Sequence, residues 1–423
     1  MTRQNSPTNI AIIGSGIAGL GLAYNLNENY NFTIFEKSTK YGGHIHSVNV
    51  MDNKKNFPID IGFMVFNQIT YPNFCNLINK LNVEIYPSDM SFSVNYRPLN
   101  LEWNGGGISK IFAQRKNLLN LKFWKFLFEL DRFNKLAPNY LEKNEHISIK
   151  EFINQQKFSK DFLNLYLIPI ASAIWSINPN NILEFPITTL YQFFYNHGFL
   201  GLNTHFQWYT IKNSTNKYLN LLTQKFQNKI ITNSSIKDLF IENDKVKLIF
   251  NDNSVKLFDK CVLATHADEA LNILKHPTKL ESDILNKFSY EKNLVTVHCQ
   301  ENVMPNNINA WGAWNWRVDK FNSQYFYSTH YWVNKLQNIP STKNFYVSLN
   351  AKHLIRDENK FFEDNLYHPQ FTKDSIQAQA KINELNQQYP KQHIYFCGSY
   401  FKYAFHEDAY TSALNLSHIL NEV

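Results

Sequence analysis

The order of apolar and polar positions over residues 9–36 predicts a strand, a helix and a second strand. Ile10–Ile13 is a short apolar run, which is typical of a strand buried in a parallel sheet. Apolar residues recur at helical intervals over Leu20–Leu26, and a second apolar run, Phe32–Phe35, ends at Glu36. This succession predicts a strand–helix–strand unit of a parallel sheet.

Three glycines connect the first strand to the helix. Gly14, Gly16 and Gly19 have the GxGxxG spacing, in which they allow a tight turn, the approach of a pyrophosphate and close helix packing, respectively. The free N–H groups and the dipole of the helix N-terminus attract that pyrophosphate. Glu36 can accept hydrogen bonds from a ribose 2′-OH and would repel a 2′-phosphate. The stretch therefore predicts a bound dinucleotide other than NADP.

The same criteria divide the rest of the chain. The candidate strands are Ile59–Phe63, Ser91–Val94, Leu99–Trp103, Trp208–Ile211, Ile230–Ile236, Thr296–Val297, Trp311–Trp316, Tyr325–Trp332, Phe345–Leu349 and His393–Cys397. Val246–Phe250 and Ser254–Phe258 are expected to form a hairpin. Helical spacing marks Tyr71–Leu81 and Glu407–Leu420, whereas the apolar run Phe162–Ile174 is expected to break at Pro169.

The layout of these elements is interleaved. Lys260–His266 is an apolar run that ends in small residues, as expected for a strand that returns to the nucleotide-binding sheet. We therefore predict an α/β protein whose nucleotide-binding domain is assembled from residues 1–75, 217–280 and 391–423. An aromatic-rich α+β substrate domain is inserted as residues 76–216 and 281–390.

The stretch Ser109–Ala137 is the longest with helical spacing. It carries many apolar residues, with six cations between them: Lys110, Arg115, Lys116, Lys122, Lys125 and Arg132. Such a helix can dock on a membrane or a lipid. The alternative, a core helix with a solvated basic face, is the interpretation that we favour.

Composition narrows the classes of protein. The chain has 423 residues, a hydrophobic content of 44% and a formal net charge of +7 without a long Lys/Arg block, so nucleic acid is not indicated. We find no apolar run as long as the ~18–20 residues of a membrane span and no signal peptide at the N-terminus. The four scattered cysteines lack metal-ligand spacing and suit a reducing cytoplasm, and we expect no metal.

Glycine is scarce and unevenly placed. The chain has only 14, and residues 1–62 contain Gly14, Gly16, Gly19, Gly21, Gly42, Gly43 and Gly62. A simple NAD site does not need the adjacent pair Gly42-Gly43 after the second strand. The pair is expected where the backbone passes the pyrophosphate of an extended cofactor such as FAD.

Several motifs resemble those of the FAD-dependent amine oxidase-like superfamily, which includes monoamine oxidases, protoporphyrinogen oxidase and carotenoid desaturases. The matching strings are GSGIAG (14–19) with Glu36, GGH (42–44), VLATHAD (262–268), FCG (396–398) and FHED (405–408). GGHIHSV (42–48), IDIGFMVFN (59–67), IPIASAIWS (168–176) and NHGFL (196–200) are similar to those of a bacterial family of NAD/FAD-binding proteins. Genes of that family often neighbour those for cyclopropane-fatty-acid synthases, which implies a lipid connection.

The resemblance implies a Rossmann-type FAD-binding domain of the amine-oxidase-like (GR2) kind and a set of FAD contacts. Glu36 would bind the adenosine ribose, His44 would lie along the pyrophosphate and ribityl chain, and the last helix would approach the flavin N1/O2 edge. The implied contacts are Gly14, Ser15, Gly16, Ile17, Ala18, Gly19, Glu36, Lys37, Gly43, His44, Gly62, Phe63, Ile236, Gly398, His406, Glu407, Asp408 and Ala409.

Three departures from the family pattern concern the flavin site. Ser399 replaces an acid that often follows the C-terminal glycine, and Ala404 and Ala409 stand where glycine is usual. Asn213-Ser214 stands where Gly-Gly is expected. A Cβ at these positions would crowd the flavin or shift a loop.

A flavin accepts a hydride at N5, so the protein supplies position, dryness and electrostatics. Tyr403 and Phe405 lie between two flavin-contacting segments and are expected to face the substrate; no catalytic base is identified among the histidines. We predict an FAD-dependent oxidoreductase acting on an apolar, lipid-derived substrate, in the cytoplasm or at the inner face of the membrane. A small-amine oxidase and a non-catalytic flavin-binding accessory of a lipid-modifying enzyme are the alternatives.

Overall fold

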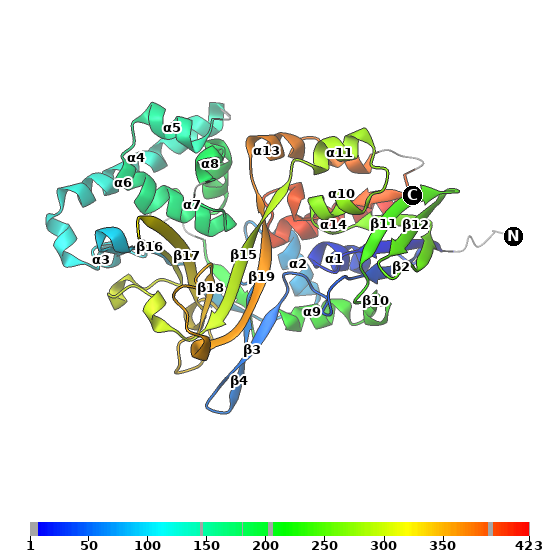
Figure 1. The fold of residues 1–423 in the computed structure, drawn as a ribbon, viewed down its shortest axis with the longest axis horizontal. Coiled ribbons are helices and arrows are strands. Elements are labelled where there is room, and N and C mark those ends of the chain that lie inside the picture. The colour runs from blue at the N-terminus through cyan, green and yellow to red at the C-terminus, as the bar shows by residue number, and fades with distance from the viewer. Residues whose placement is uncertain (1–6, 144–146, 180, 202–205, 388–391, 423) are drawn as a thin grey trace.

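A computed structural model describes residues 7–143, 147–179, 181–201, 206–387 and 392–422. A parallel sheet has the strand order β10 (Ile230–Ile231), β2 (Tyr30–Phe35), β1 (Thr8–Ile13), β14 (Lys260–Leu263) and β20 (Ile394–Phe396). Figure 1 shows this sheet at one end of the molecule and helices α4–α8 at the other, with the long strands β15 and β19 between them. The predicted return of the chain at Lys260 is confirmed, because β14 pairs with β1.

Two helices from opposite ends of the chain cover the parallel sheet. α1 (Ile17–Asn25) follows the glycine turn, and α14 (His406–Asn421) packs against it. A Cβ on Gly21 would lie 2.6 Å from the ring of Tyr410, so this glycine permits the close helix contact. The predicted strand–helix–strand unit and the C-terminal helix are confirmed.

The segment Ile230–Ile236 is not a single strand, which corrects the expectation. β10 ends at Ile231, the chain turns through Asn233 at φ 54°, and β11 (Ile236–Glu242) begins a second sheet. That sheet has the order β11, β12 (Lys245–Phe250) and β13 (Val255–Phe258), so the predicted hairpin is confirmed.

A seven-stranded sheet forms the other half of the molecule. Its order is β19 (Lys360–Gln370), β15 (Ser289–His298), β18 (Tyr346–Leu349), β17 (Gln324–Trp332), β16 (Trp314–Phe321), β7 (Phe92–Tyr96) and β8 (Leu101–Asn104). The parallel pairing of β16 with β7 joins two parts of the chain that are far apart in sequence. β19 was not expected, because its alternation of apolar and polar residues is weak. The expected domain boundary at 390/391 lies outside the described residues.

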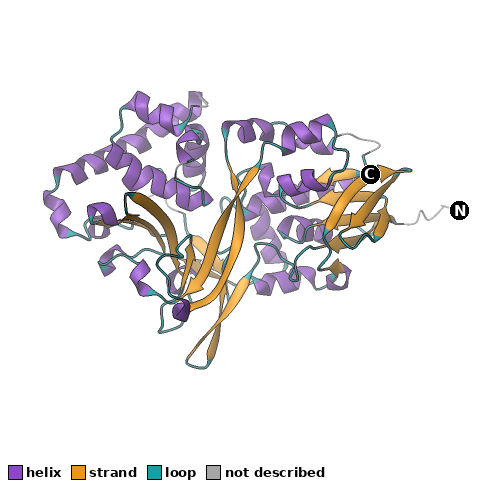
Figure 2. Cartoon of the chain, in the orientation of Figure 1, coloured by secondary structure: helices purple, strands orange, loops and turns teal. Residues whose placement is uncertain are grey.

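Helices gather beyond this sheet at one end of the molecule (Figure 2). They are α3 (Ile108–Ile111), α4 (Leu121–Lys143), α5 (Ile149–Gln156), α6 (Lys160–Phe162), α7 (Ile168–Trp175) and α8 (Ile187–Asn196). The expected helix over Ser109–Ala137 is broken, because the Asn120 side chain accepts hydrogen bonds from the N–H groups of Lys122 and Phe123 and starts a new helix. The expected break at Pro169 does not occur, because the chain stays helical: a π-helical segment over Leu163–Leu167 leads directly into α7, and the proline stands near the start of α7.

The remaining elements connect these layers. The strands are β3 (Ser47–Asp52), β4 (Lys55–Asp60), β5 (Phe66–Asn67), β6 (Ile85–Ser88) and β9 (Trp208–Ile211). The helices are α2 (Pro72–Lys80), α9 (Asn216–Thr223), α10 (Ala267–Ile273), α11 (Lys279–Leu285), α12 (Val333–Leu336) and α13 (Lys373–Gln379). Within the described ranges, no helix is both long and apolar enough to cross a membrane.

Candidate active site

A cavity of about 2210 Å³ lies between the two halves of the molecule. Its lining runs from Glu36 and Ile236 beside the parallel sheet to Ile108 and Trp124 on the helical side. This volume exceeds the ~300–1,000 Å³ of an ordinary small-molecule pocket. The cavity therefore has room for an extended cofactor together with a substrate.

The glycine turn after β1 forms the floor of one end of the cavity. A Cβ on Gly14 would lie 2.5 Å from the carbonyl oxygen of Ala264, and a Cβ on Gly19 would lie 2.0 Å from that of Gly14. These two glycines are required by packing. Gly16, in contrast, lines the cavity, and a Cβ here would meet no protein atom within 4 Å. The open space at Gly16 fits the close approach of a ligand pyrophosphate to the N-terminus of α1.

Glu36 faces the same end of the cavity from the end of β2. Its Oε2 accepts hydrogen bonds from the Ser15 N–H (3.1 Å) and hydroxyl (2.5 Å), and its Oε1 accepts one from the Ser38 N–H (2.9 Å). The carboxylate thus holds the glycine turn and also lines the cavity, where it can accept from a ribose hydroxyl. Lys37, also on the lining, pairs with Glu269.

A second loop lies against the glycine turn. The Gly42 N–H donates to the Ser15 carbonyl (3.0 Å), and a Cβ on Gly43 would lie 3.0 Å from the Cα of Gly16. A Cβ on Gly62 would lie 2.4 Å from the carbonyl oxygen of His44. The clustered glycines identified in the sequence therefore pack two loops together at one end of the cavity.

Some of the FAD contacts expected in the C-terminal segment lie on the cavity lining, and others do not. Gly398, His406 and Ala409 line the cavity, as do Ser15, Ile17, Ala18, Phe63, Tyr403 and Phe405. Gly19, Glu407 and Asp408 are not among the lining residues. Glu407 accepts from the N–H groups of Asn73 (3.0 Å) and Phe74 (2.8 Å) at the start of α2. Asp408 accepts from the Phe405 N–H (2.9 Å) and caps its own helix, and burial raises its pKa to about 7.

Three of the residues that depart from the family pattern retain a glycine-like backbone, whereas Ser399 and Ala409 do not. Asn213, Ser214 and Ala404 have φ values of 61°, 93° and 68°, in the left-handed region that favours glycine. Ser214 also contacts the Ser47 hydroxyl (2.6 Å), and Ala404 lines the cavity. These loops thus keep the backbone course that glycine would allow while carrying a Cβ.

Ala404→Gly is expected to raise the free energy of unfolding by up to about 1 kcal/mol. Relief of the left-handed alanine contributes about 1–2 kcal/mol, and the added freedom of glycine in the unfolded chain offsets about 0.5–1 kcal/mol. Ala409→Gly is the matched control in α14, where the same exchange should cost about 1 kcal/mol. Urea unfolding measures both; equal destabilisation by the two variants would contradict the assignment.

Histidines from four segments meet at the cavity. The ring of His44 lies 6.0 Å from that of His368 and 6.5 Å from that of His266, and the His406 ring stacks on Phe63 at 3.9 Å. Burial lowers the pKa of His44 to about 4, and lowers the pKa values of His368 and His406 to about 3. These rings are therefore neutral near pH 7 and can donate or accept single hydrogen bonds. Among the described residues, no group of His, Cys, Asp and Glu side chains is arranged to hold a metal ion.

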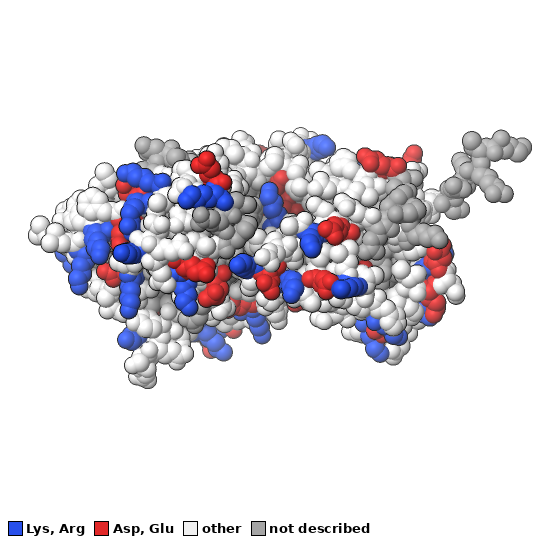
Figure 3. Space-filling model, turned by 90° about the horizontal axis from the view of Figure 1, so that it is seen from above, with Lys and Arg blue, Asp and Glu red and all other residues white. Residues whose placement is uncertain are grey.

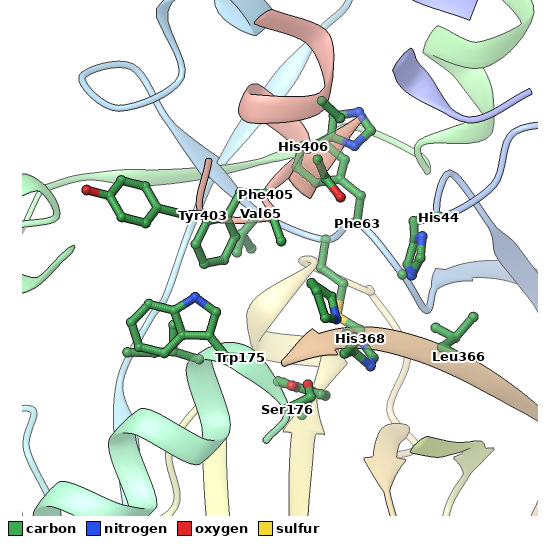
Figure 4. Close-up of a pocket in the computed structure, with 18 of the residues that line it drawn as sticks. His44, Phe63, Val65, Trp175, Ser176, Leu366, His368, Tyr403, Phe405 and His406 are labelled. Carbon is green, nitrogen blue, oxygen red and sulfur yellow. The ribbon is translucent and has the colours of Figure 1, made fainter. Parts of the chain in front are cut away.

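Aromatic side chains form the other end of the cavity. Figure 4 shows Trp175 of α7 facing Phe405, with Tyr403 on the same side of the view and Phe63 next to His406. The ring centroids of Trp175 and Phe405 are 6.4 Å apart, and Phe193 stacks on Phe405 at 5.3 Å. Sequence reasoning did not assign Trp175 or Phe193 to the site, although the first of these lies within the IPIASAIWS string.

The carboxylates on the cavity lining are mostly paired. Asp89 pairs with Lys335 (3.0 Å) and Asp131 with Lys135 (2.7 Å). Asp364, on β19, lies close enough to His46 to influence its pKa. The side chains that form the aromatic end, Trp175, Phe193, Tyr403 and Phe405, carry no charge.

Comparisons with known proteins agree with this architecture. No curated protein sequence matches the chain. A putrescine oxidase triple mutant superposes with a TM-score of 0.69 at 11% identity, covering 99% of each chain. A CLA-producing fatty acid isomerase from P. acnes gives 0.66 at 13% identity and 99% of each chain. Cyclohexylamine oxidase from Brevibacterium oxydans IH-35A gives 0.66 at 12% identity, covering 98% of this chain and 99% of its own.

At these identities, the likeness to solved structures establishes the fold. The family profile of flavin containing amine oxidoreductases matches residues 17–299, which is most of the chain. The open space at Gly16, the carboxylate of Glu36 and the size of the cavity fit FAD, the cofactor implied by that family. The chain therefore belongs to the flavin containing amine oxidoreductases, and it is an FAD-dependent oxidoreductase.

Proposed function

We propose that this enzyme oxidises an apolar, lipid-derived substrate at a C–H bond. The observation that carries the proposal is the aromatic and aliphatic wall around Trp175 and Phe405, in a cavity whose carboxylates are mostly paired with lysines. Such a wall stabilises acyl chains by removing apolar surface from water. FAD, when bound, supplies the hydride acceptor.

The residues divide the remaining tasks between them. The Gly16 turn and the N-terminus of α1 would bind the pyrophosphate, and Glu36 would bind the ribose. The N-terminus of α14, which reaches the cavity through His406 and Ala409, would stabilise negative charge on the cofactor. The neutral rings of His44 and His368 can position a polar group of the substrate, while the aromatic wall excludes water.

The structural neighbours support two substrate classes. The fatty acid isomerase shares the fold and supports an acyl substrate. Putrescine oxidase and cyclohexylamine oxidase support a second candidate, oxidation of an amine. An amine cation can be bound by a free carboxylate or by the faces of aromatic rings. Asp89 and Asp131 are paired with lysines. Asp364 and the rings of Trp175 and Phe405 are therefore the better candidates for such a contact.

Anaerobic reduction of the flavin distinguishes the two classes. The holoenzyme is mixed without oxygen with an unsaturated fatty acid or phospholipid in detergent micelles, and separately with putrescine or cyclohexylamine. We expect the lipid to bleach the visible absorbance of oxidised flavin and mass spectrometry to show a product lacking two hydrogens. Bleaching by the amines alone would replace the proposal with the amine reaction.

A further inference from the structure

Six large apolar side chains protrude into solvent on one face of the helical end. We define the α3–α4 face by Ile108, Leu118, Leu119, Leu121, Trp124 and Phe128. Leu119 and Leu121 are 91% and 84% exposed, the highest values among the large apolar residues of the described chain. An exposed apolar cluster of this kind marks a contact surface rather than an ordinary solvated face.

The same segment has a separate buried side. Phe123, Phe126 and Phe133 of α4 are buried in the helical core. Leu121, Trp124 and Phe128 are spaced by three and four residues and form another stripe on the helix, outside that core. The sequence interpretation of a core helix therefore accounts for one side of α4 and leaves the other stripe unpartnered.

Cations alternate with these apolar residues along the chain. Residues 103–128 contain no Asp or Glu, whereas Lys110, Arg115, Lys116, Lys122 and Lys125 lie among the protruding apolar residues. None of the five cations forms an ion pair within the described ranges. Figure 3 shows Lys and Arg gathered near this end of the molecule, beside an uncharged tip. Apolar side chains interspersed with unpaired cations match the interface of an anionic lipid bilayer.

The α3–α4 face also bounds the mouth of the cavity. Ile108 and Trp124 line the cavity and are exposed to solvent, 75% in the case of Ile108. Lys110 lies on the lining beside them. A molecule that enters here passes directly from the surface into the apolar part of the cavity.

We propose that the α3–α4 face docks the enzyme peripherally on an anionic lipid bilayer, with the cavity mouth against the lipid. Leu119, Leu121 and Phe128 would enter the acyl boundary, and the five cations would contact acidic headgroups. A symmetric pair of chains is a poorer occupant, because an isologous contact would bring the two sets of unpaired cations together. The proposal concerns the surface and does not depend on which substrate is oxidised.

Co-sedimentation of the full-length holoenzyme with vesicles tests the docking. The vesicles contain phosphatidylcholine alone or phosphatidylcholine mixed with phosphatidylglycerol. One variant, R115S/K122S/K125S, removes three charges, and another, L119S/L121S/F128S, removes three apolar side chains. The matched control, I241S/V255S/L257S, changes three half-exposed apolar residues on strands β11 and β13, in the antiparallel sheet beside the parallel sheet.

We expect the wild type to bind anionic vesicles and to lose that binding as salt is raised. The charge variant should bind them about a hundredfold more weakly, since each cation contributes about fivefold. The apolar variant should lose about tenfold or more, and the control should match the wild type. Thermal melting and flavin content verify that each variant is folded.

Three results would overturn the proposal. The first is wild-type protein that binds neither kind of vesicle, and the second is a control variant that loses as much binding as the α3–α4 variants. The third is a wild-type dimer that L119S/L121S/F128S converts to monomers, which would assign the face to a second copy. The anaerobic flavin assay in micelles is independent of all three results, so failure of docking and failure of lipid oxidation are distinguishable.

Discussion

Gly16→Thr is expected to produce a folded protein that has lost most of its affinity for FAD. The backbone at Gly16, with φ −70° and ψ −179°, is open to any residue, and threonine is about as good as glycine at this N-cap position. A side chain here would enter the open space beside the N-terminus of α1, where the pyrophosphate is expected. Crowding of about 1–3 kcal/mol weakens binding by roughly tenfold to a hundredfold.

Gly19→Thr is the matched control for that variant. Its Cβ would lie 2.0 Å from the Gly14 carbonyl oxygen, so it should damage the turn itself and lower the melting temperature. Titration with FAD, followed by flavin fluorescence, and thermal melting of the cofactor-free proteins separate the two effects. Wild-type FAD affinity in Gly16→Thr would show that the cofactor does not pass this turn.

Lowering the pH from 7 to 5 should strongly destabilise the cofactor-free protein. Five histidines have lowered pKa values: about 4 for His44 and His197 and about 3 for His298, His368 and His406. His197, His298 and His406 are buried, whereas His44 and His368 are partly exposed on the cavity lining. The cause is desolvation of the charged ring. In the unfolded chain, each histidine regains a pKa near 6.5 and takes up a proton that the folded protein cannot bind. Stability is therefore present above pH 6.5 and is lost as the pH falls toward 4.

Two buried carboxyls stabilise the folded protein as the pH falls, which opposes the effect of the histidines. Burial raises the pKa of Asp60 to about 6 and that of Asp408 to about 7, so their protonation favours the folded state as the pH falls from 7. At pH 5, a buried histidine that stays neutral in the folded protein costs about 2 kcal/mol, whereas the two carboxyls together return about 3–4 kcal/mol. The histidines outnumber the carboxyls, so the net effect is a loss of stability of about a few kcal/mol.

Urea unfolding at a series of pH values checks this expectation. His298→Asn is a suitable variant because His298 lies away from the cavity, and asparagine can still accept from the Gln300 N–H (3.0 Å in the wild type). The variant should take up about one proton fewer on unfolding between pH 6.5 and 4. Stability that stays constant from pH 7 to 5 would contradict the assignment of neutral, buried histidines.

The nucleotide end of the site could be predicted from the sequence because the residues that form it lie close together in the chain. Gly14, Gly16, Gly19 and Glu36 lie within one strand–helix–strand unit, where spacing alone indicates which backbone must turn, pack or remain open. The adjacent pair Gly42-Gly43 was interpretable for a similar reason, since the chain uses glycine sparingly and places it where backbones meet.

The substrate end could not be predicted as fully from the sequence, because residues far apart in the chain form it only when the protein is folded. Trp175 from α7 and Phe193 from α8 meet Phe405 only after the helical half folds against the C-terminal segment. Glu407 provides another example: the family resemblance implied a cofactor contact at the start of the last helix, and its carboxylate accepts hydrogen bonds at the start of α2, more than 300 residues earlier in the chain. Sequence spacing carries no record of such long-range partners.

The same limit applies to the α3–α4 face. Periodicity predicted an amphipathic helix with basic residues. It could not show which apolar residues of that helix are buried and which are exposed, because tertiary packing decides this. The break at Asn120 and the positions of Phe123 and Phe126 in the core determine which apolar residues are left outside. The structure thus adds an exposed apolar stripe to the core helix that the sequence analysis favoured, and this stripe motivates the proposed docking on lipid.

The most direct test of the account is a crystal structure of the holoenzyme with a bound acyl substrate. We predict the adenosine end of FAD beside Glu36 and Ile236, the pyrophosphate at Gly16, and the acyl chain between the flavin and the wall of Trp175 and Phe405. An FAD molecule bound away from the Gly16 turn, or a flavin separated from the aromatic wall so that no substrate could contact both, would contradict the account.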